Sequence, residues 1–429
     1  MNRKKTGIIG GGASGLMAAA AAGRNGRETE EIVILEKKER IGKKILVTGN
    51  GKCNLTNLDF SMERIGTYYN GADPERLRRI FSRFSEKDTL SFFSGLGMLT
   101  QSKNGYVYPL SGQASTVLDT LRFELERLGV RILTECRIRE IEPRGKKGFL
   151  VHTSEGPLFF DRLILACGSP AGEKAGSGMD GYTYAASFGH TVIPPRPALT
   201  ALRCDGDFWK GLAGVRCDAS VQLFIGPGKN GHGKNKRKDP LFRREERGEL
   251  QLTDYGISGI PVFQLSRHAS FALADGKEIW ARIDFLPSFS TQKGAYEKMA
   301  AHRIRACQGR SLEVLFCGLV NKKIIQTLLK RNGLRLSDSV CRERENAIQQ
   351  VFEELRSFSV RVVGTNPFPN AQVCAGGIPL DEVTDQMESK KYPGLYLAGE
   401  LLHVDGICGG YNLQWAWTSG TLAGRGSRL

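Results

Sequence analysis

Several features are missing from this sequence, and each absence removes a class of function. No apolar run reaches the roughly eighteen to twenty residues that span a bilayer. The charged N-terminus leads into an apolar stretch that is too short for a secretory signal peptide, so we expect a cytoplasmic protein without a membrane anchor. The ten cysteines form no C-x-x-C pair and no zinc-like quartet. Their spacing argues against a disulfide framework, a metal centre and a close redox dithiol.

Acidic residues are in deficit. The chain has 61 basic and 45 acidic residues and a formal net charge of +16, which attracts nucleic acid, a membrane surface or an anionic small molecule. Part of the excess lies between Lys229 and Arg247, in a stretch rich in glycine and asparagine. Its composition favours a solvated hairpin tip, and the alternative is a clamp for phosphates on a nucleotide-bearing substrate such as a coenzyme A thioester. Phe242 is the single Phe, Tyr or Trp within this run, and the interleaved aromatics that base stacking needs are missing around it, so nucleic acid is the less favoured partner.

The length of 429 residues predicts two or three domains, and 40% apolar with 25% charged residues is typical of a globular protein. Residues 1–196 alternate strand and helix patterns, and Pro194–Pro197 should end regular structure there. Residues 197–290 read as short strands around one helix, forming a small barrel or sandwich. Residues 291–352 are helical, and strand patterning resumes over 353–429. We therefore predict one domain inserted into another.

A glycine motif follows the first predicted strand. Gly10, Gly12 and Gly15 have the G-x-G-x-x-G spacing and stand before an alanine-rich helix. Gly10 permits a tight turn, Gly12 lets the backbone approach a pyrophosphate, and Gly15 lets helix and strand pack closely. Glu36 ends the next predicted strand, where a carboxylate accepts ribose hydroxyls and disfavours a 2′-phosphate. This order of elements predicts a dinucleotide site.

A second glycine-rich segment lies near the other end of the chain. Tyr396–Gly399 reads as a buried strand that ends in glycine, and Gly406, Gly409 and Gly410 precede a helix that begins near Asn412. Backbone N–H groups at this helix start would face the electron-rich edge of an isoalloxazine. Read together, the two segments predict bound FAD, with the two ends of the chain forming one nucleotide fold.

These motifs carry a family resemblance. The chain resembles the HI0933-like flavoproteins, a family of bacterial FAD-binding oxidoreductases associated with NAD(P), over essentially its whole length. The resemblance implies an α/β (α+β overall) fold, in which a glutathione-reductase-like FAD-binding Rossmann domain carries an inserted β-barrel and a small helical domain. The matching segments are Gly42–Asn57, Gly178–Tyr182, Pro197–Leu199, Gly248–Gly259, Gly376–Ile378, Gly399–Leu402 and Gly409–Gln414.

The resemblance also implies a set of cofactor-binding residues. Ser14, Glu36 and Lys37 should hold the adenosine half of FAD, and Ile138 should offer its backbone to adenine. Lys44, Cys53 and Asn54 should line the path to the ring, without Cys53 acting as a nucleophile. No catalytic residue is assigned, although Tyr411, Cys408 and His403 are expected near the ring. The full predicted set is Gly10, Gly12, Ala13, Ser14, Gly15, Glu36, Lys37, Lys44, Cys53, Asn54, Ile138, Ala166, Gly168, Gly399, Glu400, Gly410, Tyr411 and Asn412.

The leading functional hypothesis is reduction of a conjugated enone. Reduced FAD would pass a hydride from N5 to the β-carbon, a proton would reach the α-carbon, and NAD(P)H would recharge the flavin. No second nucleotide fold is visible, so NAD(P)H should visit only transiently. The resemblance implies 3-oxo-4,6-dienoyl bile-acid coenzyme A thioesters, steroids of secondary bile acid metabolism, as substrates.

Two alternatives remain open at this stage. The first is an FAD-dependent amine oxidase of the aminoacetone type, in which oxygen reoxidises the flavin and peroxide is released. The second is a flavin-containing factor that binds or modifies RNA, a role that the net charge of +16 permits. The sequence does not choose between NADH and NADPH, and it assigns no oligomeric state.

Overall fold

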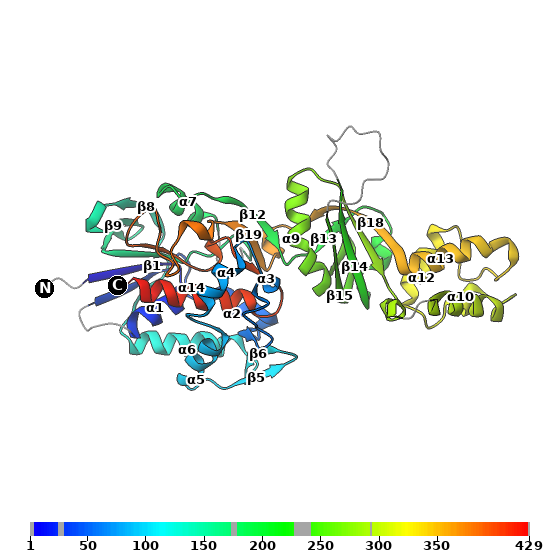
Figure 1. The fold of residues 1–429 in the computed structure, drawn as a ribbon, viewed down its shortest axis with the longest axis horizontal. Coiled ribbons are helices and arrows are strands. Elements are labelled where there is room, and N and C mark those ends of the chain that lie inside the picture. Colours follow the sequence, from blue (N-terminus) through cyan, green and yellow to red (C-terminus); the bar gives the residue numbers. More distant parts are fainter. Residues whose placement is uncertain (1–3, 25–29, 173–177, 227–241, 292–293, 428–429) are drawn as a thin grey trace. The chain divides into compact units, whose positions relative to one another are not determined.

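Two compact units make up the protein. We call them the sheet unit, Met1–Arg196 with Phe368–Leu429, and the barrel unit, Pro197–Pro367. In the colours of Figure 1, both the blue and the red ends of the chain belong to the sheet unit. The computed structural model describes residues 4–24, 30–172, 178–226, 242–291 and 294–427. Most of the basic run at 229–247 therefore lies outside the described residues, which resume at 242.

A five-stranded parallel sheet, in the order β20–β11–β1–β2–β7, is the centre of the sheet unit. Apolar runs such as Ile32–Leu35 and Leu163–Leu165 are buried, as expected for parallel strands that are covered on both faces. Strand β20 pairs with β11, so sequences from both ends of the chain share one sheet, and the Rossmann prediction is confirmed. The strands are β1 (Lys4–Ile9), β2 (Glu30–Leu35), β7 (Arg131–Leu133), β11 (Arg162–Leu165) and β20 (Leu395–Leu397).

The first and last long helices pack directly against each other. Helix α14 (Tyr411–Gly426), red in Figure 1, lies along the blue helix α1 (Ala13–Arg24). A Cβ atom at Gly420 would lie 2.3 Å from the carbonyl oxygen of Ser14, and one at Gly424 would lie 2.3 Å from that of Ala18. The two glycines therefore permit a contact between helix backbones that any side chain would prevent.

Smaller sheets and helices surround this core. Two of the helices are α4 (Pro74–Phe81) and α6 (Ala114–Arg127). Strands β9 (Phe149–Thr153) and β10 (Gly156–Phe160) form a hairpin, and β8 (Ile138–Pro143) joins them in an antiparallel sheet. The other elements are α2 (Lys43–Val47), β3 (Thr56–Asn57), α3 (Ile65–Tyr68), β4 (Tyr69–Asn70), α5 (Glu86–Gly95), β5 (Thr100–Lys103), β6 (Tyr106–Pro109), α7 (Asp180–Ser187) and β21 (Asp405–Gly406).

The barrel unit contains a closed barrel with the strand order β13–β16–β15–β14–β17–β18. Alternate residues of its strands, such as Val221 and Leu223, are fully buried inside it. The sequence left a barrel and a sandwich open, and the structure has the barrel. Its elements are β13 (Leu202–Cys204), α8 (Trp209–Leu212), β14 (Arg216–Ile225), β15 (Phe242–Thr253), β16 (Gly256–Gly259), α9 (Ile260–Ala274), β17 (Ile279–Asp284) and β18 (Phe358–Thr365).

Helices α10 (Ala295–Ala306), α11 (Leu312–Phe316), α12 (Lys322–Arg331) and α13 (Glu345–Ser357) occupy the predicted helical region. Their buried residues join those of the barrel in a single hydrophobic core. The ring centroids of Phe352 and Phe316 lie 4.9 Å apart within the helices. Those of Phe358 and Phe285 lie 5.8 Å apart, where α13 ends and β18 begins. The helical segment therefore shares its core with the barrel.

Two boundaries differ from the sequence-based expectation. The expected start of the second nucleotide-binding segment, residue 353, falls inside α13, and β18 pairs with β13 and β17 of the barrel. A strand pattern does not say which sheet the strand joins. In addition, β12 (Ile193–Ala198) runs through the prolines that were expected to end regular structure. It pairs with β19 (Val373–Gly377) in a two-stranded sheet, and an edge strand tolerates proline.

One negative finding concerns membranes. Within the described ranges, no helix combines the length and the apolar character needed to cross a bilayer.

Candidate cofactor-binding site

Glycine occupies the three positions after β1 for different structural reasons. Gly10 has a φ of +107°, and a Cβ atom there would lie 2.5 Å from the carbonyl oxygen of Ala166. A Cβ atom at Gly15 would lie 1.9 Å from the carbonyl oxygen of Gly10. A Cβ atom at Gly12, by contrast, would meet no protein atom within 4 Å. The fold therefore requires Gly10 and Gly15, whereas Gly12 faces open space that a ligand can enter.

The ends of four parallel strands bring the predicted residues together. Gly10, Glu36 and Ala166 directly follow β1, β2 and β11, and Gly399 comes two residues after β20. Because the strands are parallel, these positions share one edge of the sheet. Helix α1 begins at the same edge, where the N–H groups of its first turn have no partner within the helix. Such an edge is the usual binding place of a dinucleotide pyrophosphate.

Glu36 connects the glycine turn to the end of β2. Its Oε2 accepts a hydrogen bond from the backbone N–H of Gly11 at 2.8 Å, and its Oε1 accepts one from that of Lys38 at 2.9 Å. Each carboxylate oxygen can accept a second hydrogen bond. The side chain is therefore held in place by the backbone and retains acceptor capacity for ribose hydroxyls.

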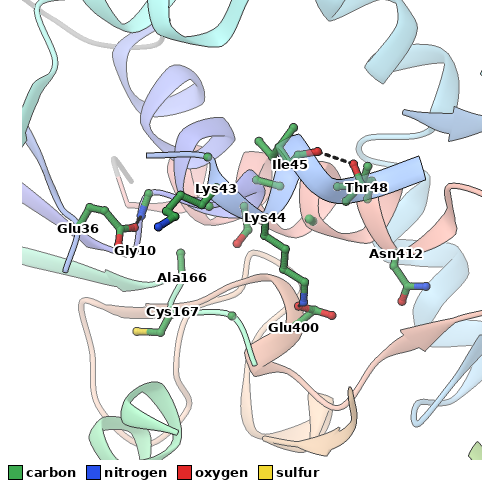
Figure 2. A pocket seen from close by; sticks show the side chains of 18 of the residues that line it. Gly10, Glu36, Lys43, Lys44, Ile45, Thr48, Ala166, Cys167, Glu400 and Asn412 are labelled. Carbon is green, nitrogen blue, oxygen red and sulfur yellow. Dashed lines mark hydrogen bonds and ion pairs between the residues drawn. The ribbon is translucent and has the colours of Figure 1, made fainter. Parts of the chain in front are cut away.

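An ion pair joins the loop after β2 to the segment after β20. Lys44 Nζ lies 2.5 Å from Glu400 Oε2, and Ser169 Oγ donates to the same oxygen at 3.3 Å. Figure 2 shows the Lys44 side chain reaching towards the Glu400 carboxylate. The second oxygen, Oε1, is buried and has no hydrogen-bond partner in the described part of the chain. It is an acceptor that a bound ligand can satisfy.

A pocket with about 850 Å³ of empty space lies at this edge of the sheet (Figure 2). Basic side chains line it in excess over acidic ones, which suits an anionic ligand. The predicted cofactor-binding residues that line it are Gly10, Gly12, Ala13, Ser14, Glu36, Lys44, Ala166, Gly168, Glu400 and Asn412.

A second pocket, with about 1110 Å³ of empty space, shares Gly10 and Glu36 with the first. The predicted residues Lys37 and Ile138 line this second pocket. The carbonyl oxygen of Ile138 accepts a hydrogen bond from Tyr184 Oη at 3.0 Å, so one of its acceptor positions is already used. Lys37 Nζ lies 2.7 Å from the carboxylate of Asp180, which also lines the pocket. The two pockets adjoin through their shared residues, and all of their lining residues belong to the sheet unit.

Two asparagines organise the turn before α14. The Asn54 amide, oriented to satisfy both of its ends, accepts from the backbone N–H of Gly410 at 3.1 Å and donates to the Thr56 carbonyl at 3.0 Å. The Asn412 side chain donates to the carbonyl of Gly406 and accepts from its N–H, each at 2.8 Å. Gly410 has a φ of +94° and directly precedes the helix. These side chains fix the loop, and the start of α14 borders the first pocket through Asn412.

Six of the predicted residues line neither pocket. Cys53 is fully buried, and burial raises the pKa of its thiol to about 12, so it is protonated at neutral pH. The ring of Tyr411 stacks on that of Tyr68 with centroids 4.8 Å apart, and burial raises the pKa of its hydroxyl. Contact between these residues and a cofactor stays a prediction. The six are Gly15, Cys53, Asn54, Gly399, Gly410 and Tyr411.

Sequence reasoning missed other residues of the site. Lys38, Arg40 and Lys43 line the first pocket, and their signal was the cluster of basic residues directly after Glu36. Cys167 lines both pockets, and burial raises the pKa of its thiol to about 12. A protonated thiol is a poor nucleophile. The sequence places Cys167 directly after a predicted strand, but it does not indicate that this side chain lines the site.

No candidate metal site is present among the described residues. No group of three or more His, Cys, Asp and Glu side chains lies there in an arrangement that could hold a metal ion. All ten cysteines are free.

Comparisons with known proteins agree with this geometry. A family model described as "HI0933-like protein Rossmann domain" matches residues 4–426. The 3-dehydro-bile acid delta(4,6)-reductase of Clostridium scindens is 43% identical over 99% of this chain and 98% of its own. The ribosomal RNA dihydrouridine synthases of Haemophilus influenzae and Escherichia coli are 25% and 26% identical, each over 96% of this chain and 95% of their own. The 3-ketosteroid-delta4-(5alpha)-dehydrogenase of Rhodococcus jostii has a similar fold, with a TM-score of 0.50 and 15% identity over 99% of this chain and 97% of its own.

Proposed function

Because the chain belongs to the HI0933-like Rossmann-domain family, we propose that it is an FAD-dependent reductase of carbon–carbon double bonds conjugated to a carbonyl group. The observation that carries the proposal is the full-length similarity, at 43% identity, to a bile acid delta(4,6)-reductase. The two adjoining pockets at the sheet edge support it, since the residues that line them suit a dinucleotide.

The residues at the site fit FAD. Glu36 would accept hydrogen bonds from the ribose, and the first turn of α1, beginning at Ala13, would hold the pyrophosphate. Gly12 leaves room for that approach, since a Cβ atom there would meet no protein atom within 4 Å. The buried Oε1 of Glu400, which has no partner among the described residues, would accept from a hydroxyl group of the cofactor. A carboxylate at position 36 favours FAD over a ligand with a 2′-phosphate in this pocket.

When bound, FAD would supply hydride transfer, with NAD(P)H as the transient reductant. The balanced reaction consumes one NAD(P)H and one proton for each double bond that is saturated. The chain contributes binding and orientation: Asn412 and Asn54 hold the turn at the start of α14, and Lys44 fixes Glu400. The excess of basic side chains around the pocket, including Lys38, favours an anionic cofactor.

For the substrate we propose a 3-oxo-4,6-diene steroid of the bile-acid type, carried as a coenzyme A thioester. The name of the Clostridium scindens relative supports the steroid, and the net charge of +16 suits the anionic carrier. The test is NAD(P)H oxidation by the FAD-loaded protein with a 4,6-dien-3-one bile-acid thioester, with the saturated product identified by mass spectrometry. Peroxide release from an amine, without turnover of the dienone, would replace this proposal by the amine oxidase.

A second candidate substrate is uridine in RNA. Two full-length relatives are ribosomal RNA dihydrouridine synthases, and the net charge of +16 favours a polyanion. The C5–C6 bond of uracil is conjugated to the C4 carbonyl, so its saturation is the same hydride and proton addition. The lower identity, 25–26% against 43%, places this candidate second. Formation of dihydrouridine in ribosomal RNA by the FAD-loaded protein with NAD(P)H would establish it.

A further inference from the structure

A row of side chains crosses four strands on the outer face of the barrel. The cross-strand partners are Arg243 of β15 with Phe224 of β14, Phe224 with Trp280 of β17, and Trp280 with Arg361 of β18. Paired residues point to the same face of a sheet. We call Arg243, Phe224, Trp280 and Arg361 the barrel row. It places two aromatic residues at paired cross-strand positions, between two arginines.

The barrel row is open to solvent at its centre. Trp280 has 45% of its surface exposed, while the other three tryptophans of the chain are at most 1% exposed. Phe224 is half-buried, and Arg243 is exposed. An exposed tryptophan with an aromatic residue as its cross-strand partner is uncommon on a protein surface and often marks a binding site.

Positive charge surrounds the two rings. The guanidinium of Arg282, which is exposed in the next row, lies 4.8 Å from the centroid of the Phe224 ring, and that of Arg243 lies 5.6 Å from it. Arg243 also donates to Gln222 Oε1 at 3.3 Å. Arg282 and Arg361 form no ion pair with a carboxylate in the described part of the barrel unit. Their charges are therefore available to a ligand.

Two acidic residues lie close by. Glu245, in the same row as Arg282, accepts hydrogen bonds from Ser220 and Gln222, which occupy its carboxylate. Glu278 precedes strand β17 and is exposed. Against these two carboxylates stand three arginines, Arg243, Arg282 and Arg361, so the net charge around the rings is positive.

We propose that the barrel row and Arg282 bind single-stranded RNA. A base would stack on the exposed ring of Trp280, because every base has an aromatic face and stacking tolerates any sequence. The arginines would contact the phosphates, which lie on both sides of a stacked base. A sheet surface with exposed aromatics and flanking cations is a recurring platform for single-stranded nucleic acid.

The charge argues for RNA over the other occupants. A protein partner or a second copy of this chain would bury Trp280 with apolar groups and would have to neutralise three arginines, while this chain itself carries a net charge of +16. An anionic lipid surface would satisfy the charges, but it offers no flat rings for the paired aromatics. Both occupants serve as outcomes of the test.

This inference goes beyond enone reduction and does not depend on it, because no residue of the barrel row lines either pocket of the sheet unit. The sequence disfavoured nucleic acid because the basic run at 229–247 lacks interleaved aromatics, and the barrel row shares only Arg243 with that run. The rings of the barrel row come from two other parts of the sequence, residues 224 and 280, and become neighbours only when β14 and β17 pair.

The test is fluorescence polarisation of a labelled twelve-nucleotide single-stranded RNA with the full-length, FAD-loaded protein. The change Trp280→Ala should weaken binding about tenfold, since it removes a stacking partner, and Trp280→Phe should restore most of the affinity. Arg282→Gln should weaken binding and reduce the slope of log affinity against log salt by about one. The matched controls are Phe159→Ala, which removes an exposed aromatic of the sheet unit, and Arg310→Gln, which removes an exposed arginine; both should bind within about twofold of wild type.

Unchanged RNA affinity in Trp280→Ala, or binding that does not respond to salt, would overturn the proposal. If RNA binding were absent, two further results would also overturn it. One is a Trp280-dependent dimer in sedimentation, and the other is Trp280-dependent binding to phosphatidylserine vesicles. NAD(P)H oxidation with the steroid dienone, measured on the same variants, should be unchanged. Failure of the RNA surface and failure of the proposed reductase activity are therefore separate results.

Discussion

Lys44 Nζ and Glu400 Oε2 lie 2.5 Å apart although the two residues are separated by 356 positions in the sequence. Their side chains are 24% and 15% exposed, so the pair is largely shielded from water. The contact joins helix α2 to the turn after β20, and both residues line the first pocket. The two ends of the chain are thus held together at the site by charge as well as by the shared sheet.

The effects of removing the two partners of this pair should not be additive. We expect Lys44→Met and Glu400→Gln each to lower the free energy of unfolding by about 1–3 kcal/mol, because each leaves a poorly solvated partner behind. The double variant should lose clearly less than the sum, as measured by urea unfolding of the apoprotein. The exposed pair Lys322–Glu313 is the control and should show coupling under about 1 kcal/mol. Strictly additive effects of the Lys44 and Glu400 substitutions would show that the two side chains do not stabilise each other.

Glu36 should be needed for cofactor affinity. The change Glu36→Ala removes a charged acceptor, and we expect FAD to bind about tenfold to a hundredfold more weakly. Titration of the apoprotein with FAD, followed by quenching of flavin fluorescence, measures this directly. Glu155→Gln, at an exposed position in the β9–β10 hairpin, should leave the affinity unchanged. Wild-type affinity in Glu36→Ala would mean that the ribose binds elsewhere.

Gly12 and Gly15 should respond to alanine in opposite ways. A Cβ atom at Gly12 meets no protein atom within 4 Å, so Gly12→Ala should fold normally but bind FAD at least about tenfold more weakly, by obstructing the pyrophosphate. A Cβ atom at Gly15 would lie 1.9 Å from a backbone oxygen, so Gly15→Ala should be destabilised by more than about 3 kcal/mol. Thermal unfolding and FAD titration of both variants separate the two roles. Normal FAD binding by Gly12→Ala would show that no ligand approaches that glycine.

The interaction of His190 with Glu382 should make stability depend on pH. Burial would raise the pKa of Glu382, but hydrogen bonds from Thr191, Lys391 and His190 outweigh it and lower this pKa from 4.5 to about 2. Burial lowers the pKa of His190 below 6.5, with the Glu382 hydrogen bond partly opposing it. Both groups therefore bind protons less readily in the folded state than in the unfolded chain. The contribution of these two groups to the free energy of unfolding should be complete above about pH 6.5. It should fall at lower pH in two stages.

The second stage belongs to Glu382. Its contribution, about 2 kcal/mol, should be present above pH 4.5 and should be lost as the pH falls towards 2. The change Glu382→Gln should lower stability at pH 7 and flatten the profile between pH 4.5 and 2.5, as measured by urea unfolding at each pH. The exposed Glu126→Gln should retain the wild-type profile. An unchanged slope in Glu382→Gln would assign the acid sensitivity to other carboxylates.

The sequence was sufficient wherever local geometry imposes one residue type. Gly10 and Gly15 were recognisable because a turn and a helix contact admit only glycine, and Glu36 because it ends a strand at a fixed distance from that turn. Lys38 and Arg40 were missed as pocket residues because a surface cation has the same sequence signal whether or not it faces a pocket. The assignment of β18 to the barrel also required the structure, since pairing between distant strands leaves no local pattern.

The close contact of α1 with α14 has a consequence for biosynthesis. A nascent polypeptide that has left the ribosome only as far as the barrel still lacks β20, α14 and Glu400, so its first glycine turn has neither its neighbouring strand nor its covering helix. The barrel unit, in contrast, is encoded as one continuous stretch and can complete its own core during translation. We therefore expect acquisition of the nucleotide to be among the last events of maturation, after synthesis of the final helix.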